Sequence, residues 1–222
     1  MTDKILVSPS ILSGDFANMG KTVKLAEGWG ADWIHCDVMD VVYVPNFTFG
    51  MPMIEAIRKH TVLPLDVHLM IDKPEKYAER FVKAGADIVT FHPEASECPL
   101  NVLKQIKKMG KKAGIALNPN VNIADFEYLF SECDIIVIMT VYAGYGGQKL
   151  IDECLNRIVE VRKILNSIGS KAVIEVDGGI TEENCTAVVK SGGNVLVAGS
   201  SVYKSQNPAE TIKKLSGVAK PN

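Results

Sequence analysis

Ionisable side chains lie inside three short apolar segments of this chain, each with the composition of a β-strand. The segments are Ile34–Val38, Leu65–Met70 and Val173–Gly179. Successive side chains of a strand point to opposite faces, so His35 and Asp37 share a face while Cys36 lies on the other. The same alternation places on shared faces Asp66, His68 and Met70 in the second segment, and Glu175 and Asp177 in the third.

Charged groups are rarely held inside apolar strands unless they are paired or bind a metal. Two imidazoles and two carboxylates at the carboxyl ends of strands therefore predict a metal-centred acid/base site of His35, Asp37, His68 and Asp177. This donor set suits one divalent ion, which is zinc, iron(II), manganese or cobalt. The alternative is that the histidines are satisfied core residues and the aspartates cap turns. His92, which ends a fourth predicted strand, either supports the site or is structural.

Glycines follow three further strand ends. The three groups are Gly144-Tyr145-Gly146-Gly147-Gln148, Asp177-Gly178-Gly179-Ile180 and Gly199-Ser200-Ser201. Glycine lets the backbone approach a phosphate closely, and the N–H groups at the start of a following helix favour its charge. One glycine pair marks only a tight turn, but three groups at consecutive strand ends predict a phosphate site.

Three methionines, Met39, Met70 and Met139, fall at or near the ends of strands that carry the polar residues. Methionine is most often a gap-filling core residue. Its polarizable sulfur can also cover a flat, anionic intermediate without offering a competing proton.

Strand-like and helix-like segments alternate along the whole chain. The predicted strands are Ile5–Leu12, Trp33–Val38, Pro64–Ile71, Asp87–Phe91, Lys112–Leu117, Ile135–Val141, Ala172–Val176 and Val195–Ala198. The predicted helices are Asp15–Gly28, Pro74–Ala84, Leu100–Met109, Asp152–Ser167, Glu182–Ser191 and Pro208–Ser216, with shorter ones at Pro52–His60 and Ile123–Ser131. This pattern favours an α/β fold, a (β/α)8 TIM barrel spanning residues 1–222 as one domain, over an open doubly wound sheet.

Size and composition agree with one soluble globular domain. The 222 residues are 47% hydrophobic and 23% charged, with a formal net charge of −2. That charge gives no general attraction to nucleic acid or to an anionic membrane. The five scattered cysteines indicate neither a disulfide framework nor a zinc finger. Met1-Thr2-Asp3-Lys4 leads directly into the first predicted strand, and no apolar run approaches a membrane span. We therefore expect a cytoplasmic protein.

Several motifs together resemble the ribulose-phosphate 3-epimerase family. They run in order from about residue 5 to about residue 203, and are Ser8-Pro9-Ser10-Ile11-Leu12-Ser13-Gly14-Asp15-Phe16, His35-Cys36-Asp37-Val38-Met39-Asp40, Val44-Pro45-Asn46-Phe47-Thr48, Leu65-Asp66-Val67-His68-Leu69-Met70, Gly144-Tyr145-Gly146-Gly147-Gln148, Glu175-Val176-Asp177-Gly178-Gly179 and Val197-Ala198-Gly199-Ser200.

The resemblance implies a (β/α)8 barrel that interconverts D-ribulose 5-phosphate and D-xylulose 5-phosphate in the pentose phosphate pathway, and a homo-oligomer, either a dimer or a hexamer. It implies a divalent metal held by the four residues named above, with Asp37 and Asp177 as the acid/base pair. Ser10 and His68 would touch the sugar. The residues implied to hold the rest of the substrate and its phosphate are Gly144, Tyr145, Gly146, Gly147, Gly178, Gly179, Gly199 and Ser200.

Two departures from the family pattern lie outside the metal residues. Asp40-Val41 stands where the family usually has Asp-Gly, and Tyr142-Ala143 where it usually has Asn-Pro. Positive φ suits a β-branched residue poorly, so we expect Val41 to send the Asp40–Asn46 loop along a different path. Both changes bear on substrate preference.

Three other functions compete with the pentulose 5-phosphate epimerase. The nearest is a 3-epimerase of D-allulose 6-phosphate. A second is a phosphate-binding barrel that decarboxylates or condenses its substrate, for which an Asp–Lys pair at a strand end is expected and not found. The last is a non-catalytic sugar-phosphate-binding barrel, which has no need of two carboxylates.

Overall fold

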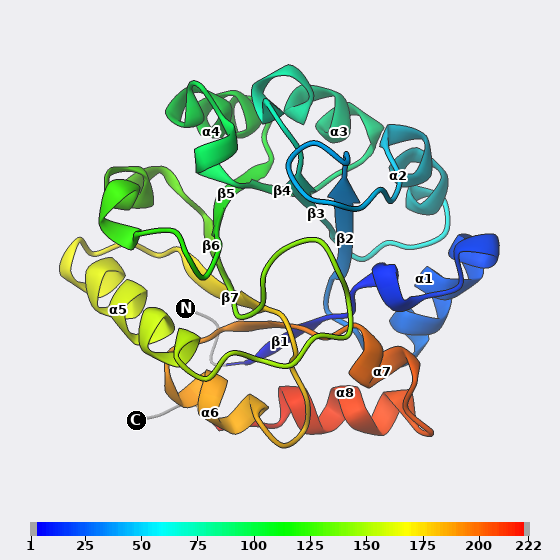
Figure 1. The fold of residues 1–222 in the computed structure, drawn as a ribbon. Helices are drawn as coiled ribbons and strands as arrows, with labels where there is room; N and C mark the ends of the chain where they lie inside the picture. Colours follow the sequence, from blue (N-terminus) through cyan, green and yellow to red (C-terminus); the bar gives the residue numbers. More distant parts are fainter. Residues whose placement is uncertain (1–3, 220–222) are drawn as a thin grey trace.

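The computed structural model describes residues 4–219, so Met1 to Asp3 lie outside the described part. Figure 1 looks along the axis of a ring of strands surrounded by helices. The strands are β1 (Leu6–Ser8), β2 (Ile34–Met39), β3 (Leu65–Met70), β4 (Ile88–Phe91), β5 (Lys112–Leu117), β6 (Ile135–Met139), β7 (Val173–Asp177) and β8 (Val195–Val197). They form one 8-stranded parallel sheet in the order β1-β8-β7-β6-β5-β4-β3-β2. The predicted (β/α)8 barrel is confirmed, and the open doubly wound sheet is wrong.

The ring closes between β1 and β2 by a short seam. Within residues 4–219 these two strands share no extended ladder, and one parallel bridge pairs Ser10 with His35. The His35 N–H donates to the Pro9 carbonyl at 3.1 Å, and the Trp33 N–H donates to the Val7 carbonyl at 3.4 Å. The seam therefore runs through one of the predicted metal ligands.

The helices are α1 (Met19–Gly28), α2 (Met51–Arg58), α3 (Ala78–Ala84), α4 (Pro99–Lys108), α5 (Cys154–Ser167), α6 (Cys185–Lys190), α7 (Ser200–Tyr203) and α8 (Pro208–Ser216). Proline occupies the first turn of α2, α4 and α8, where its missing N–H leaves no bond unmade. Gly85 ends α3 in the left-handed region, with φ 119°.

The structure corrects several predicted elements. The segment predicted as a helix at Ile123–Ser131 forms two 3₁₀ turns, Ile123–Asp125 and Glu127–Glu132, because Phe126 between them leaves helical geometry at φ −123°. Strand β1 ends at Ser8, because Ser10 accepts from the Leu12 N–H and begins another 3₁₀ turn. Helix α7 was not predicted, since four residues are too few to show a period.

Alternating strand residues face either the barrel interior or the helices. Interior residues such as Ile88, Ala116, Val137 and Val195 form one buried cluster. Cys36 belongs instead to the cluster between strands and helices, so its predicted orientation away from His35 is confirmed. Both faces of the sheet are therefore packed, as a parallel sheet requires.

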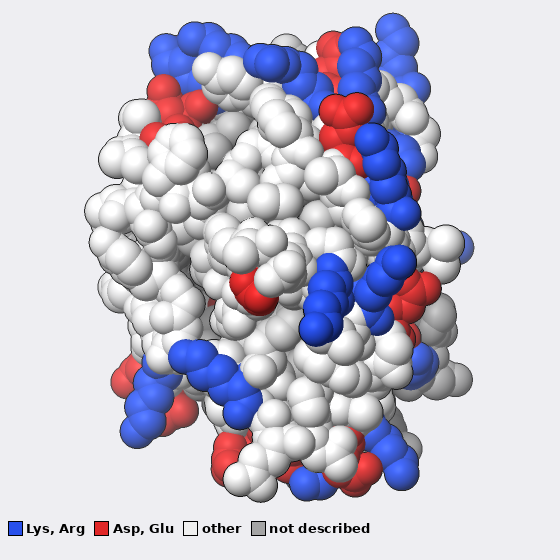
Figure 2. All heavy atoms as spheres, turned by 90° about the vertical axis from the view of Figure 1, so that its right-hand side faces the viewer, with Lys and Arg blue, Asp and Glu red and all other residues white. Residues whose placement is uncertain are grey.

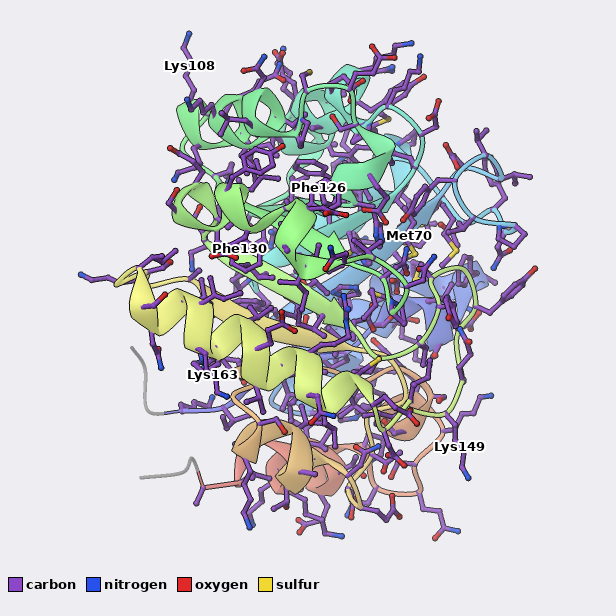
Figure 3. All side chains as sticks on the ribbon, turned by 60° about the vertical axis from the view of Figure 1, so that its left-hand side comes forward. Met70, Lys108, Phe126, Phe130, Lys149 and Lys163 are labelled. Carbon is purple, nitrogen blue, oxygen red and sulfur yellow. The ribbon has the colours of Figure 1, made fainter. Side chains whose placement is uncertain are left out.

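Apart from the buried carboxyl groups of Asp37, Asp66 and Glu175, the charged side chains of the described residues lie outside this core. Figure 2 shows Lys, Arg, Asp and Glu mixed in sign, mostly toward the upper and lower edges, around a broad uncharged area. In Figure 3 Lys108 and Lys163 extend outward from their helices, whereas Met70 lies near the opening of the barrel. Among the described residues, no helix combines the length and apolar composition needed to cross a membrane.

Candidate metal centre and substrate pocket

The four predicted metal residues meet at the carboxyl ends of β2, β3 and β7. Each offers one donor atom, and the four atoms lie within 4.8 Å of one another. The Nε2 atom of His35 lies 3.3 Å from an Asp37 oxygen, and the Nδ1 atom of His68 lies 3.6 Å from an Asp177 oxygen. Asp37 and both histidines are buried, and Asp177 is half-buried.

Two ring nitrogens make this cluster suited to a cation. His35 Nε2 and His68 Nδ1 are buried, and neither has a hydrogen-bond partner among residues 4–219. Buried polar atoms are almost always bonded, so two unbonded nitrogens facing the same carboxylates need a common partner. Two imidazole nitrogens with two carboxylates form a donor set for a tetrahedral divalent ion. The residues present therefore fit a metal ion.

The carboxylates favour positive charge at this point. Burial lowers the pKa of His68, but Asp177 and Asp37 outweigh it and raise that pKa to about 9. Burial likewise opposes charge on His35, yet Asp37 and Asp66 raise its pKa well above the ordinary value. Burial raises the pKa of Asp37, but the neighbouring histidines, His35 most strongly, hold it far below its usual range. Protons on the imidazoles and a divalent cation are alternative sources of the same positive charge.

Two further carboxyl groups hold His35 from behind. Its Nδ1 atom lies 2.7 Å from an Asp66 oxygen and 3.1 Å from a Glu175 oxygen. An N–H must lie on Nδ1 to bond Asp66, which leaves the lone pair on Nε2 for a metal. Burial, followed by the charge of Asp66, raises the pKa of Glu175 to about 8, so Glu175 is protonated at neutral pH.

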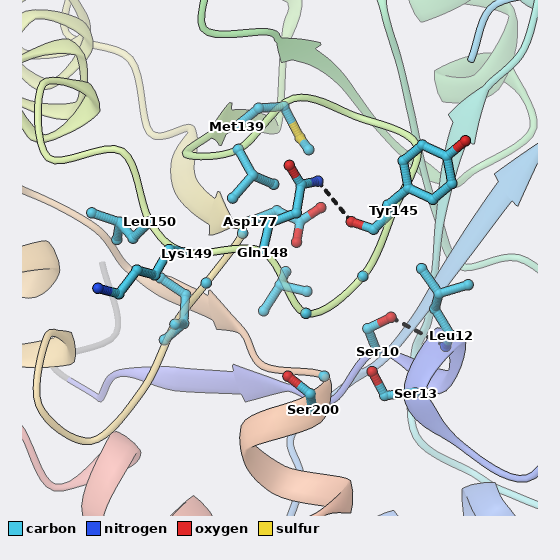
Figure 4. A pocket seen from close by; sticks show the side chains of 18 of the residues that line it. Ser10, Leu12, Ser13, Met139, Tyr145, Gln148, Lys149, Leu150, Asp177 and Ser200 are labelled. Carbon is cyan, nitrogen blue, oxygen red and sulfur yellow. Dashed lines mark hydrogen bonds between the residues drawn. The ribbon is translucent and has the colours of Figure 1, made fainter. Parts of the chain in front are cut away.

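A pocket of about 590 Å³ opens directly above the cluster (Figure 4). Asp37 and Asp177 form part of its lining, whereas His35 and His68 lie beneath it. The other predicted substrate residues that line it are Ser10, Met39, Met70, Met139, Gly144, Tyr145, Gly146, Gly147, Gly178, Gly179, Gly199 and Ser200. The contact predicted between His68 and the sugar stays a prediction.

Ser10 connects the pocket wall to the metal residues. Its hydroxyl donates to Asp37 and accepts from the Leu12 N–H at 3.2 Å. Met39 and Met70 pack together with Val44 in a small apolar cluster at the same level. The methionines are therefore core residues and pocket lining at once.

Two adjacent glycines after β7 are required by close backbone contacts. Gly179 has φ 66°, and a Cβ there would lie 2.3 Å from the Leu150 nitrogen. Gly178 has φ 123°, and its Cβ would lie 2.5 Å from a Val141 methyl carbon. Side chains are excluded at both positions, so the backbone itself lines this part of the pocket.

Two loops meet across the mouth of the pocket. The Asn46 side-chain amide donates to the Gly144 carbonyl at 2.8 Å, and the Tyr145 hydroxyl donates to the Pro45 carbonyl at 2.8 Å. The Gln148 amide also donates to the Tyr145 carbonyl at 2.8 Å, which is drawn in Figure 4. The first two bonds fasten the loop after β2 to the loop after β6, and the third is internal to the loop after β6.

The sequence predicts a different path for the Asp40–Asn46 loop on the premise that Val41 avoids positive φ, and that premise is wrong. Val41 has φ 65°, because its loop is held on several sides. One Asp40 oxygen accepts from the N–H groups of Val42 at 2.8 Å and Tyr43 at 2.9 Å, and the Val41 N–H donates to Asn46. These bonds keep the β-branched residue in a conformation that normally favours glycine.

Sequence reasoning named only His92 among the residues behind His68. His92 lies 3.0 Å from it, and Glu94, Tyr43 and Asn118 surround His92 in turn. His92-Pro93-Glu94 directly follows β4, so its place at a strand end was the available signal. Asn118 directly follows β5 and carries the same signal, whereas Tyr43 lies within the loop after β2 and carries none.

Known proteins match this chain over nearly its whole length. The family model "Ribulose-phosphate 3 epimerase family" matches residues 6–203. The ribulose-phosphate 3-epimerase of Synechocystis sp. is 46% identical over 223 residues, covering 100% of this chain and 97% of the relative. That of Bacillus subtilis is 46% identical over 214 residues, covering 96% of this chain and 99% of the relative.

Solved structures show the same barrel at much lower identity. The 3-hexulose-6-phosphate synthase of Salmonella typhimurium has a TM-score of 0.66 at 21% identity, covering 96% of this chain and 97% of that one. At this identity the likeness concerns the fold alone. The family match is of another kind, because it is collinear and includes every strand end described above. This chain belongs to the ribulose-phosphate 3-epimerase family and is an isomerase of that type.

Proposed function

We propose that the protein is a metal-dependent 3-epimerase that interconverts D-ribulose 5-phosphate and D-xylulose 5-phosphate by two-base proton transfer. The observation that carries the proposal is the pair Asp37 and Asp177, which reach one pocket floor from β2 and β7. These strands are not neighbours in the ring, because β1 and β8 lie between them. The two carboxylates therefore approach a bound substrate from different directions.

Inversion at C3 of a 2-ketose needs such an arrangement. The C3 proton is acidified by the adjacent C2 carbonyl, and its removal gives an enediolate. One carboxylate takes this proton, and the other delivers a proton to the opposite face. A divalent ion held by His35, Asp37, His68 and Asp177 would supply positive charge for the negative charge that develops on the substrate oxygens.

The remaining pocket residues suit a phosphorylated substrate. Backbone at Gly178 and Gly179 is exposed to the pocket without side chains, and Gly199 and Ser200 lie at the start of α7 beside it. Glycine backbone can approach phosphate oxygens closely. The buried methionines would cover the planar enediolate without donating a proton.

A six-carbon ketose phosphate, D-allulose 6-phosphate, is the second candidate substrate. Tyr142 and Ala143, which depart from the family pattern, both line the pocket. Tyr142 is half exposed at the pocket and brings a large ring to its lining. A packing difference of one hydroxymethylene, the second substrate's extra group, is worth roughly 10–200-fold in kcat/KM. The number of family motifs that the chain retains favours the pentulose.

The other two functions fit the pocket less well. A decarboxylating or condensing barrel is expected to pair Asp with Lys, but Lys149 lines the pocket from a loop and its ammonium points away from Asp177 in Figure 4. A non-catalytic barrel gives no reason for two carboxylates beside two unbonded imidazole nitrogens.

The test uses purified full-length protein loaded separately with Zn²⁺, Mn²⁺, Co²⁺ or Fe²⁺. Each ketose phosphate is incubated in deuterated water, and the label at C3 and the epimer formed are followed. We expect deuterium at C3 and a higher kcat/KM for the pentulose. A higher value for allulose 6-phosphate would change the substrate but keep the mechanism. Binding without exchange or epimerisation would favour the non-catalytic barrel.

Replacing either acid/base carboxylate tests the two-base mechanism. Asp37→Asn and Asp177→Asn should each abolish epimerisation, because inversion needs both a base and an acid. Asp177→Asn should still exchange the C3 proton with solvent if Asp37 removes it first. Metal content is measured in parallel. Near wild-type turnover in either metal-loaded variant would contradict the mechanism.

The assembly, location and pathway of the protein stay predictions. We expect a homo-oligomer, a dimer or a hexamer, which light scattering of the purified protein would measure. Cytoplasmic location stays an expectation from the sequence, and a role in the pentose phosphate pathway is the one that the proposed substrate implies.

A further inference from the structure

We propose that His92 and Glu94 are positioning residues that fix the ring tautomer of His68, so that its Nδ1 lone pair faces the metal. This inference rests on the metal site of the proposed function. It concerns residues that take no part in binding the ion or the substrate.

The first step is the contact between the two histidines. His68 Nε2 and His92 Nε2 lie 3.0 Å apart, and both side chains are completely buried. Two N–H groups would collide at this distance and two lone pairs would repel. One proton must therefore lie between the rings, and either His68 donates it or His92 does.

The second step is that metal binding allows only one of these directions. A neutral imidazole carries one proton, and His68 Nδ1 must be unprotonated to bind a cation. The proton of His68 therefore lies on Nε2 and is donated to His92. His92 Nε2 then accepts, which requires the proton of His92 to lie on its Nδ1.

The third step is what His92 Nδ1 faces. A Glu94 oxygen lies 3.6 Å from it, and the same oxygen accepts the Tyr43 hydroxyl at 2.7 Å. Burial raises the pKa of Glu94, but His92 and Tyr43 outweigh this and hold it below its usual range. Because His92 Nε2 accepts the His68 proton, the only proton of the His92 ring lies on Nδ1, the nitrogen that faces Glu94. An ionised carboxylate can only accept, and it therefore favours the proton on Nδ1.

Asn118 is the group that could reverse the order. Its amide nitrogen lies 3.4 Å from His92 Nδ1, and donation there would place the His92 proton on Nε2 and the His68 proton on Nδ1. The amide is held elsewhere, since its oxygen accepts the Ala143 N–H at 3.2 Å and its nitrogen donates to the Tyr43 hydroxyl at 2.7 Å. The second N–H of the amide also has an acceptor, a Glu94 oxygen at 3.5 Å, so both of its N–H groups are satisfied without donation to His92.

The direct test is ¹⁵N NMR of the histidine rings in the full-length, zinc-loaded protein and in the same protein without zinc. We expect the His92 ring to carry its proton on Nδ1 in both. A His92 proton on Nε2 would overturn the proposal. The His92 tautomer is measured without metal as well. A His92 proton on Nε2 therefore contradicts this proposal alone, whereas a wild-type protein that binds no metal would contradict the proposed function.

Variants measure the effect on metal affinity by competition with a chelator. His92→Phe removes the acceptor of the His68 proton and should weaken Zn²⁺ binding about 10–100-fold, as loss of a group that orients a ligand does. His92→Gln supplies an amide oxygen as acceptor and should restore part of the loss. Glu94→Gln should also weaken binding.

Glu97→Gln is the matched control, because it neutralises a carboxylate of the same segment that pairs with Lys73 at the surface. It should bind zinc as the wild type does. Equal zinc affinity of His92→Phe, Glu94→Gln and this control would overturn the proposal. The free energy of unfolding without zinc is measured for each variant, so that a loss of stability is not mistaken for a loss of ligand orientation.

Discussion

At the scale of single residues, the two carboxyl groups behind His35 have different roles. Asp66 accepts the His35 N–H at 2.7 Å, whereas Glu175 lies beside both with a pKa raised to about 8 by burial and by Asp66. Only one imidazole proton faces two buried acids. A proton on Glu175 removes the repulsion between the two acids, and Asp66 remains the acceptor of the His35 N–H.

This difference predicts unequal effects of two isosteric substitutions at pH 7. Asp66→Asn removes the carboxyl acceptor and should weaken metal affinity about 10–100-fold. Glu175→Gln replaces a neutral acid by a neutral amide and should change affinity much less. Chelator competition measures both. Equal losses in the two variants would contradict the assigned protonation.

At the scale of elements, the sequence predicted the strands that carry the chemistry better than the turns. Alternation and apolar composition gave all eight strands, with Lys112–Leu117 exact. The same alternation brought His35, His68 and Asp177 to one place before any contact was known. Alternation did not predict the turns at Phe126 and Ser10. Local hydrogen bonds determine such turns, and they depend on backbone dihedral angles that composition does not report. Tyr43 and Asn118 were missed because only the closed ring brings them together.

The loop after β2 gives a testable case of strain. Val41 is 58% exposed with φ 65°, so its side chain contributes little burial to offset an unfavourable backbone conformation. Val41→Gly should stabilise the protein by about 1 kcal/mol, because relief of strain exceeds the added entropy of the unfolded chain. Urea unfolding of the wild type and variant measures this.

Val42 provides the control for that substitution. It is 72% exposed and does not have positive φ, so Val42→Gly only adds unfolded-chain entropy and should destabilise by roughly 0.5–1 kcal/mol. Equal destabilisation by both substitutions would show that the positive φ of Val41 carries no strain.

At the scale of the whole molecule, metal binding and stability are linked through protons. The pKa of His68 is raised to about 9 without metal, so its protonated form stabilises the fold fully below pH 6.5 and loses this effect as pH rises through 9. A metal ion competes with that proton. The stabilisation by metal should therefore grow as pH rises through the same window.

The experiment measures the free energy of unfolding with and without metal at pH 6.5 and pH 8. At a free concentration of 100 times Kd the metal should add about 2.7 kcal/mol. At one fixed free concentration the gain should be larger at pH 8. A gain that is independent of pH would mean that His68 releases no proton on binding.

The seam between β1 and β2 has a consequence for how the barrel opens. This pairing consists of one bridge, which joins Ser10 to His35. The Ser10 hydroxyl donates to Asp37, and the His35 ring lies beside Asp37 at the predicted metal position. The place with the fewest strand-to-strand bonds is thus also the place where the donor atoms converge. Separation of β1 from β2 would disperse the donors, so an ion bound there opposes it. Backbone amides of the seam should therefore exchange with solvent more slowly when metal is bound, while those of the β5–β6 ladder keep their rate.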